Sequence, residues 1–269
     1  TLPRMDLSRP SSSSPLRRRA ALRSSVVAAL AAALVLTGCT PAPSTPDEDP
    51  ASAAIATMLD EITQQEFTEH QFTSLVAQVM IDGQVISTVT LGEEMTGFPV
   101  TEDSRFRNGA VAIMYVGATM LAMADEGLID IDEPIARWLP DLPDADQATP
   151  RMLASMTAGY PDHVANADFL AAQAANPFRA WTEDELLAYS AASPRLFAPG
   201  ENWDYSHAGY MHLGNVLEAA SGKTLDELIT KYVLKPLKLD GTVADVTARI
   251  PAPAVHGFTA ERGLFEDSS

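Results

Sequence analysis

Cysteine, lysine and long apolar runs are all scarce in this chain. Its 269 residues contain one cysteine, Cys39, so a disulfide within the chain is excluded and the fold must rest on its apolar core. The apolar run from Val26 to Leu36 is about half as long as the ~20 residues that a membrane-spanning helix needs, which argues against such a helix. The first lysine is Lys223, so most of the chain lacks a primary amine.

Several catalytic and metal-binding motifs are also absent. The chain has no Gly-x-Ser-x-Gly, no His-Glu-x-x-His and, in any register, no Ser-x-x-Lys. Its five histidines are not spaced as metal ligands are, so we expect neither a metal nor a cofactor. His163, beside Asp162, is interpreted as a surface-loop histidine. Met114, Met120 and Met123 are interpreted as core filling.

The N-terminal 38 residues differ from the rest. They hold six of the 18 basic side chains but one of the 36 acidic ones, followed by the apolar run and then Leu36-Thr37-Gly38-Cys39. This order is typical of a secretory signal, and its end resembles a bacterial lipobox, so we expect a signal peptide over 1–38 and lipidation of Cys39. The alternative is an ordinary cleaved signal with an incidental cysteine. Residues 39–52, rich in Pro, Thr, Ser and Asp, are predicted to form a tether.

These features predict an exported protein, lipid-anchored at the outer face of the cytoplasmic membrane in a bacterial cell envelope. Without residues 1–38 the chain carries a formal charge of −23. Binding phosphates requires clustered lysine and arginine, so nucleic acid is not an expected partner. Contact with the membrane is expected through the lipid anchor alone.

Residues 53–269 have the length of one domain. Helical spacing of apolar residues is found at 53–67, and β-prone runs at 75–81 and 85–89 flank Asp82-Gly83, which predicts a hairpin. Residues 110–124 contain no charge, which favours a helix buried on all sides. Further helices are predicted at 181–191, 208–220 and 225–234. The order indicates an α+β domain.

Several ordered motifs resemble one known family, between about Thr73 and Phe258. They are Arg105-Phe106-Arg107 before the apolar helix, Asp125-Glu126-Gly127 after it, Trp138-Leu139-Pro140, Met156-Thr157-Ala158-Gly159, Pro199-Gly200-Glu201, Tyr205-Ser206, Leu213-Gly214-Asn215 and Lys235-Pro236-Leu237. The set is similar to the β-lactamase-related serine hydrolases, which include class C β-lactamases, DD-carboxypeptidases and related esterases. The resemblance implies a β-lactamase/transpeptidase-like α+β fold, with an antiparallel sheet flanked by helices and an all-α region. It also implies that the last strands and a closing helix lie beyond residue 269.

The family's reactive residues are not all present. The resemblance places its Ser-x-x-Lys at Ala110 and Ile113, and its Tyr-x-Asn at Tyr205 and His207. In the family the serine attacks a carbonyl after a base takes its proton. A methyl group cannot attack and an alkyl group cannot hold a proton, so we predict impaired catalysis. Tyr205 keeps the position of the family's tyrosine, and His207 stands in place of an amide, at a helix start that Ser206 is expected to cap.

Two functions remain open from the sequence. In the first, the domain keeps the family's cleft to bind a cell-wall peptide, a small acyl compound or another partner without hydrolysing it. In the second, it is an active esterase, DD-peptidase or β-lactamase-like enzyme with an unrecognised nucleophile such as Ser206, Ser155 or Thr157. A fluorophosphonate probe distinguishes them, because labelling requires an activated hydroxyl.

Overall fold

The protein's structure is a computed structural model that describes residues 50–244, 247, 249–259, 263 and 266–267. The chain divides into two units, Thr1–Asp47 and Glu48–Ser269, and every described residue belongs to the second. The predicted signal sequence, Cys39 and residues 39–49 of the predicted tether lie outside the described residues.

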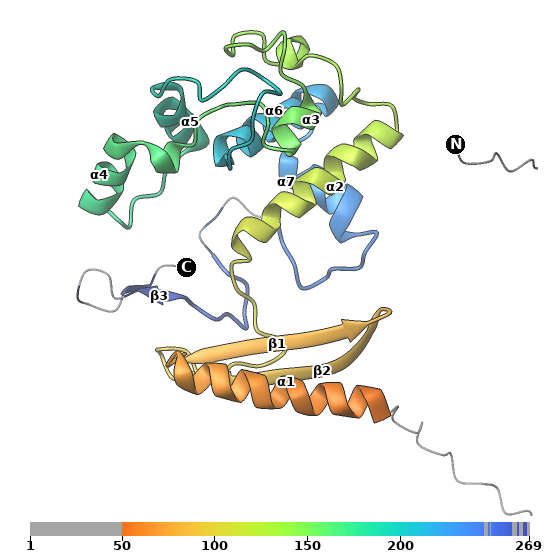
Figure 1. Cartoon of the computed structure of the whole chain (residues 1–269), viewed down its shortest axis with the longest axis vertical. Coiled ribbons are helices and arrows are strands. Elements are labelled where there is room, and N and C mark those ends of the chain that lie inside the picture. Colours follow the sequence, from red (N-terminus) through yellow and green to blue (C-terminus); the bar gives the residue numbers. More distant parts are fainter. Residues whose placement is uncertain (1–49, 245–246, 248, 260–262, 264–265, 268–269) are drawn as a thin grey trace, which may run out of the picture. The chain divides into compact units, whose positions relative to one another are not determined.

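The described unit is an α+β arrangement that begins with a helix and a hairpin and continues as a mainly helical region (Figure 1). Its elements are α1 (Pro50–Glu69), β1 (Ser74–Ile81), β2 (Gln84–Gly92), α2 (Ala112–Asp125), α3 (Pro150–Ala154), α4 (Ala167–Ala175), α5 (Glu183–Ala191), α6 (His207–Ser221), α7 (Leu225–Ile229), β3 (Phe258–Thr259) and β4 (Glu266–Asp267). Short 3₁₀ turns, η1 (Gly109–Val111), η2 (Ile135–Arg137) and η3 (His163–Ala165), and a π-helical turn, η4 (Thr230–Leu234), connect some of them.

The predicted hairpin is confirmed. β1 and β2 pair antiparallel, with Ile81 opposite Gln84 and one irregularity in register between Val79 and Met80. The two residues between the strands, Asp82 and Gly83, have φ angles of 50° and 77°. Positive φ at both central positions matches the twist of the flanking strands, and Asp-Gly adopts it at low cost.

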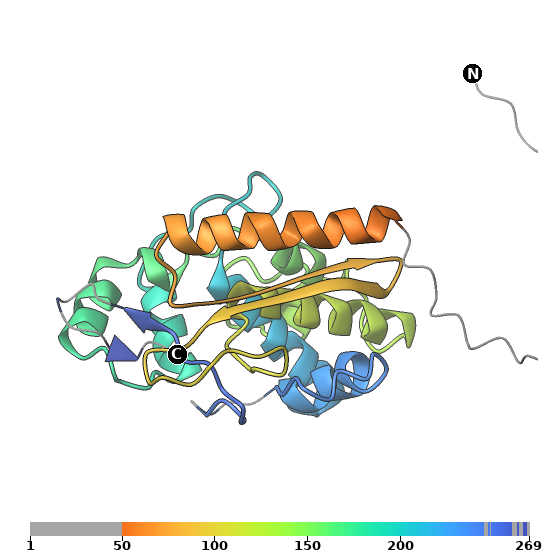
Figure 2. The ribbon, with the colours of Figure 1, turned by 90° about the horizontal axis from the view of Figure 1, so that it is seen from below.

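Helix α1 packs along this hairpin, on the side turned away from α2 (Figures 1 and 2). It begins at Pro50 rather than at residue 53, so residues 50–52, assigned to the tether from composition, form its first turn. Proline suits the first turn of a helix, where its missing N–H has no intrahelical partner to lose. The helix thus starts earlier than apolar spacing alone indicated.

The core lies where α2, α3, α6 and α7 meet. Its fully buried members include Met123 on α2, Leu153 on α3, Leu217 on α6 and Leu228 on α7. Burying such side chains stabilises the fold by about 1.5–3 kcal/mol each. This cluster packs α2 and α6, the helices near whose beginnings the sequence-predicted site residues lie, into one body.

Burial of α2 on all sides is not observed. Val116, Thr119, Met120 and Met123 are buried, but 71% of Met114 is exposed. Core contacts come from α6 and α7 on one face of the helix, and the face that carries Met114 lies outside that contact. The prediction of a helix buried on all sides, which rested on its lack of charge, is therefore wrong. Met120 and Met123 are core residues as predicted, but Met114 is not.

The other predicted helices are confirmed with shifts of a few residues. Thr182 and Glu185 form a reciprocal capping box at the start of α5. Helix α6 ends at Gly222, whose φ of 69° is the left-handed conformation favoured at helix ends. The last predicted helix is α7 continued by η4. Among the described residues, none of the helices combines the length and apolarity that crossing a membrane requires.

Candidate functional site

Ala110 and Ile113, the positions of the predicted serine and lysine, lie at the beginning of the central helix. Ala110 is an exposed residue of the 3₁₀ turn η1, and Ile113 is a half-buried residue in the first turn of α2. Neither side chain has an atom that can attack a carbonyl or carry a proton. The first turn of α2 therefore presents an apolar surface where the resemblance implied a nucleophile and its base.

The lysines do not compensate for Ile113. The Lys231 ammonium lies 3.1 Å from Glu126 Oε2 and donates to the Tyr232 hydroxyl. Glu126 caps the C-terminal end of α2, a helix of 14 residues and about 20 Å in length, so Lys231 is held at the opposite end from Ala110. The other lysines, Lys223, Lys235 and Lys238, are exposed after α6.

Tyr205 and His207 are brought together at the start of α6. Their rings meet edge to face with centroids 5.0 Å apart. Between them, Ser206 is buried and its hydroxyl accepts the Gly209 N–H at 2.9 Å, which confirms the expected helix cap. This cap fixes the direction of the backbone, so the two rings on either side of Ser206 have defined positions.

A buried carboxylate, Asp162, holds His207 from a distant part of the chain. Its Oδ2 accepts the His207 backbone N–H at 2.9 Å and His207 Nδ1 at 2.7 Å, while Oδ1 accepts the Val164 N–H at 3.2 Å. Burial alone would raise the pKa of Asp162, but these bonds outweigh it and leave the pKa below its ordinary value. The carboxylate is therefore charged and committed to His207.

His163 is not a surface-loop histidine. It is 6% exposed and its ring packs edge to face on Phe169, with centroids 5.0 Å apart. Its Nδ1 lies 3.2 Å from Asp162 Oδ1 but outside hydrogen-bonding geometry. Burial lowers the pKa of His163, so its imidazole is neutral. The error arose because a polar dipeptide in a loop gave no sign of the apolar side chains around it.

The loop carrying Asp162 is fixed by close backbone contacts. Gly159 has a φ of 80°, and a Cβ added there would lie 2.2 Å from the Phe197 carbonyl oxygen. The Gly200 and Asp204 N–H groups donate to the Thr157 and Met156 carbonyls at 2.8 and 3.2 Å. These hydrogen bonds join the segment that precedes Tyr205 to the segment that precedes Asp162, so the two segments position each other.

Sequence analysis identified His207 and Tyr205 but missed Asp162. Its partner lies 45 residues further along the chain, and no spacing rule connects the two. In the described part of the chain, no three or more His, Cys, Asp or Glu side chains are grouped so that they could hold a metal ion. The available chemistry is that of a histidine–carboxylate pair beside a tyrosine.

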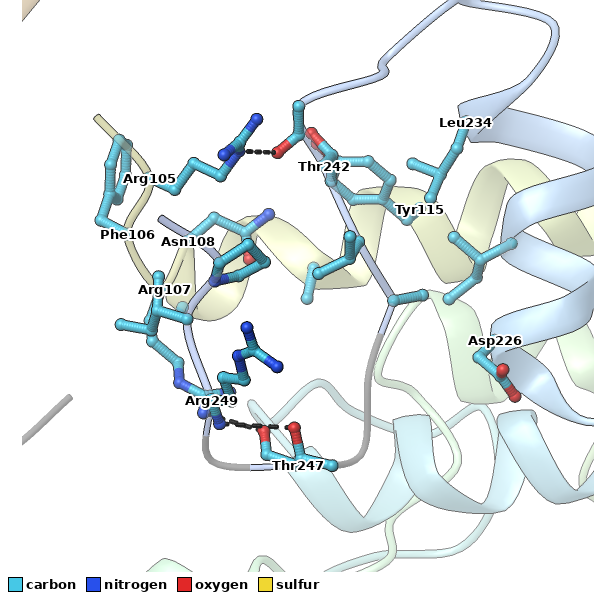
Figure 3. A pocket seen from close by; sticks show the side chains of 18 of the residues that line it. Arg105, Phe106, Arg107, Asn108, Tyr115, Asp226, Leu234, Thr242, Thr247 and Arg249 are labelled. Carbon is cyan, nitrogen blue, oxygen red and sulfur yellow. Dashed lines mark hydrogen bonds between the residues drawn. The ribbon is translucent and has the colours of Figure 1, made fainter. Parts of the chain in front are cut away.

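A separate pocket of about 690 Å³ opens on another face of α2 (Figure 3). Ala112, Tyr115 and Val116 line it, together with arginines that precede the helix, and the four sequence-predicted positions do not. Arg105 donates to the carbonyls of Gly241 and Ala252, and Arg107 donates to that of Thr247 at 3.0 Å. These bonds attach the two arginines to the segment that follows the helices.

The chain was compared with families of known proteins. A model described as Beta-lactamase matches residues 58–267. Among curated proteins, Esterase EstB from Burkholderia gladioli is 30% identical over 199 residues, covering 69% of this chain and 50% of the relative. Penicillin-binding protein 4* from Bacillus subtilis is 24% identical over 176 residues, covering 65% of this chain and 38% of the relative. The chain thus spans half or less of the length of these two relatives.

Solved structures give the same likeness at the level of the fold. A D-stereospecific amidohydrolase from Streptomyces sp. superposes with a TM-score of 0.67 and 25% identity, covering 77% of this chain and 64% of that one. The D-amino acid amidase of Ochrobactrum anthropi SV3 superposes with a TM-score of 0.66 and 23% identity, covering 82% and 61%. These likenesses confirm the expected β-lactamase/transpeptidase-like architecture.

Proposed function

Because the chain belongs to the Beta-lactamase family, we propose that it is an exported, lipid-anchored domain that binds acyl compounds without being acylated. The observation that carries this proposal is the start of α2, where Ala110 and Ile113 present only alkyl groups. Acylation requires a nucleophile and a group that takes its proton. Alkyl groups stand at both positions, three residues apart, while the surrounding fold is kept.

The hydroxyls considered as substitute nucleophiles are poorly suited to that role. Ser206 is 4% exposed, and its oxygen is occupied in capping α6. The Ser155 hydroxyl donates to the Arg151 carbonyl at 2.8 Å and lies 3.0 Å from the Thr157 hydroxyl. Neither bond supplies a base. These contacts support the binding function over the alternative of an active serine hydrolase.

The proposed class of ligand follows from the chain's family and from the polar side chains at the start of α6. The relatives are named as an esterase, a penicillin-binding protein and amide hydrolases, whose ligands share an acyl group next to a leaving oxygen or nitrogen. Tyr205, at the position of the family's tyrosine, and His207, in place of its amide, lie at the start of α6, where they can form hydrogen bonds with such a ligand. The proposed ligand is a cell-wall peptide or a small acyl compound.

Two measurements on the full chain test this function. A fluorophosphonate probe should label no residue, and a peptide ending in D-alanyl-D-alanine should bind with saturation, measured by isothermal titration calorimetry. Tyr205→Phe should weaken that binding, whereas Tyr189→Phe, in the aromatic contact between α4 and α5, should not. Probe labelling, or equal binding by both variants, would contradict the proposal.

A further inference from the structure

The geometry of Asp162 and His207 fixes which imidazole nitrogen is free. A charged carboxylate can only accept, so the proton of the neutral ring is on Nδ1, which lies 2.7 Å from Asp162 Oδ2. The lone pair is then on Nε2. A carboxylate that orients an imidazole in this way also stabilises the ring when it gains a proton. Asp162 thus prepares His207 to accept a proton at Nε2.

The two side chains differ in access to solvent. The Asp162 side chain is 7% exposed, whereas that of His207 is 44% exposed. The carboxylate is therefore shielded while the ring it holds is open to water and ligands. His70 offers a useful contrast, because its Nε2 lies 3.1 Å from Glu66 on the surface of α1 and both partners are exposed. An exposed pair of that kind is not held in one geometry.

The groups around His207 favour this role. Tyr205 is half-buried and packs against the edge of the ring, and its hydroxyl makes no hydrogen bond with any described residue, so its proton can be donated to a ligand oxygen. His163 lies with its ring centroid 5.7 Å from that of His207 and is neutral, because burial lowers its pKa. Asp162 is the charged group that faces the imidazole.

We propose that His207, positioned by Asp162, is a general base that activates water for the direct hydrolysis of esters bound beside the start of α6. His207 Nε2 takes a proton from water as the water oxygen bonds to the acyl carbon, and the carbonyl electron pair moves to oxygen. The Tyr205 hydroxyl donates a hydrogen bond to that oxygen. The adduct then collapses, the C–O bond to the leaving group breaks, and the leaving oxygen takes the proton from Nε2, giving a carboxylic acid and an alcohol.

This activity rests on the proposed function for its acyl ligand, but it needs no residue to be acylated. Water is the nucleophile, so alkyl side chains at Ala110 and Ile113 do not prevent the reaction. General-base assistance of this kind contributes about 10²–10⁴-fold to a rate. The expected enzyme is slow and leaves no acyl intermediate.

The test is hydrolysis of p-nitrophenyl acetate by the full chain, measured in water and in deuterated water. His207→Asn, which places the family's amide at this position, should lower kcat/KM by about 10²-fold. Asp162→Asn should lower kcat with little change in KM, because it removes the positioning of the base. His70→Asn is the matched control and should leave the rate unchanged. Wild-type turnover should slow in deuterated water, because proton transfer from water to Nε2 limits it.

Several results would overturn this assignment. They are an unchanged rate in His207→Asn, an equal loss in His70→Asn, and an acetyl group on His207 detected by mass spectrometry, which would make the ring a nucleophile. Labelling of a serine or threonine by the fluorophosphonate probe would instead contradict the proposed function. The two failures are therefore distinguishable, since one concerns the base and the other the absence of an acylated hydroxyl.

Discussion

At the scale of single residues, two buried histidines affect how this protein responds to acid. His212, on α6, packs against the Tyr160 ring with centroids 4.9 Å apart and is 7% exposed. Burial, and after it the positive charge of Arg195, lowers the pKa of His212 from 6.5 to about 4. His163 is shifted in the same direction by burial. Two neutral imidazoles are thus enclosed in the helical region, where protonation is costly.

We predict that this burial makes the fold sensitive to acid. Below pH 6.5 the unfolded chain binds a proton at His212 that the folded chain does not bind until about pH 4. The free energy of unfolding is therefore not reduced by His212 above pH 6.5, and it decreases as the pH falls from 6.5 towards about 4. The free energy of unfolding in urea should decrease by about 2 kcal/mol between pH 7 and pH 5 from His212 alone.

The matched variant is His212→Phe, which keeps a ring against Tyr160 and removes the titrating group. Its unfolding free energy should fall less steeply with acidification than that of the wild type. If both proteins lose stability in parallel, the acid sensitivity has another origin.

Among the elements, the loop between α3 and η3 shows how backbone packing positions the candidate site. Gly159 allows the chain to approach the Phe197 carbonyl more closely than a Cβ would permit. Because Asp162 lies only three residues further along the chain, a displacement at Gly159 is transmitted to the hydrogen bond between Asp162 and His207. Glycine at this position serves a close approach as well as a positive φ.

Gly159→Ala should therefore destabilise the protein by about 3 kcal/mol or more, since it adds a clash with backbone to the strain of a positive φ. Gly127→Ala is the control, because Gly127 has a φ of 72° and nothing within 4 Å of an added Cβ. That variant should lose about 1 kcal/mol from strain alone. Equal losses in urea unfolding would show that the clash is relieved without cost.

Some features of the helices and strands could be predicted from the sequence, and others could not. The Asp82-Gly83 hairpin, the Ser206 cap and the end of α6 at Gly222 were predictable, because each depends on residues within a few positions of one another. The Asp162–His207 pair and the exposure of Met114 were not, because each depends on which segments pack together. The order of the motifs along the chain predicted the fold and the positions of Ala110 and Ile113 within it. The local apolar pattern alone would have predicted only a helix.

At the scale of the whole molecule, the β1–β2 hairpin is expected to promote association between copies of the chain. In the described part of the chain, β1 and β2 pair only with each other, and Val76, Met80 and Val85 are exposed on them. Unpaired strand edges with apolar side chains favour pairing with other chains. Residues 50–269 should therefore associate at micromolar concentration, as measured by sedimentation velocity.

Val76→Lys combined with Val85→Lys should shift the sedimentation of this segment toward monomer. Gln65→Lys combined with Gln64→Lys adds the same charge to exposed positions of α1 and should have less effect. A monodisperse wild-type monomer would contradict this expectation.

Membrane attachment is a second prediction for the whole chain. The Arg-rich segment, the short apolar run and Leu36-Thr37-Gly38-Cys39 predict lipidation of Cys39 in a bacterial host. More than one acyl chain is needed for stable anchoring, as one chain binds only weakly. Labelled palmitate should enter the wild-type protein and not Cys39→Ala. Equal labelling of the two proteins would locate the lipid elsewhere or exclude it.

The central claim is that this Beta-lactamase family chain binds acyl compounds but is not acylated by them. The most direct measurement is the intact mass of the full chain after long incubation with excess penicillin. We predict an unchanged mass, because Ala110 and Ile113, at the positions that the family resemblance gives to the nucleophile and its base, can neither form an acyl bond nor take a proton. A gain equal to the mass of the drug, mapped to any residue, would contradict the account.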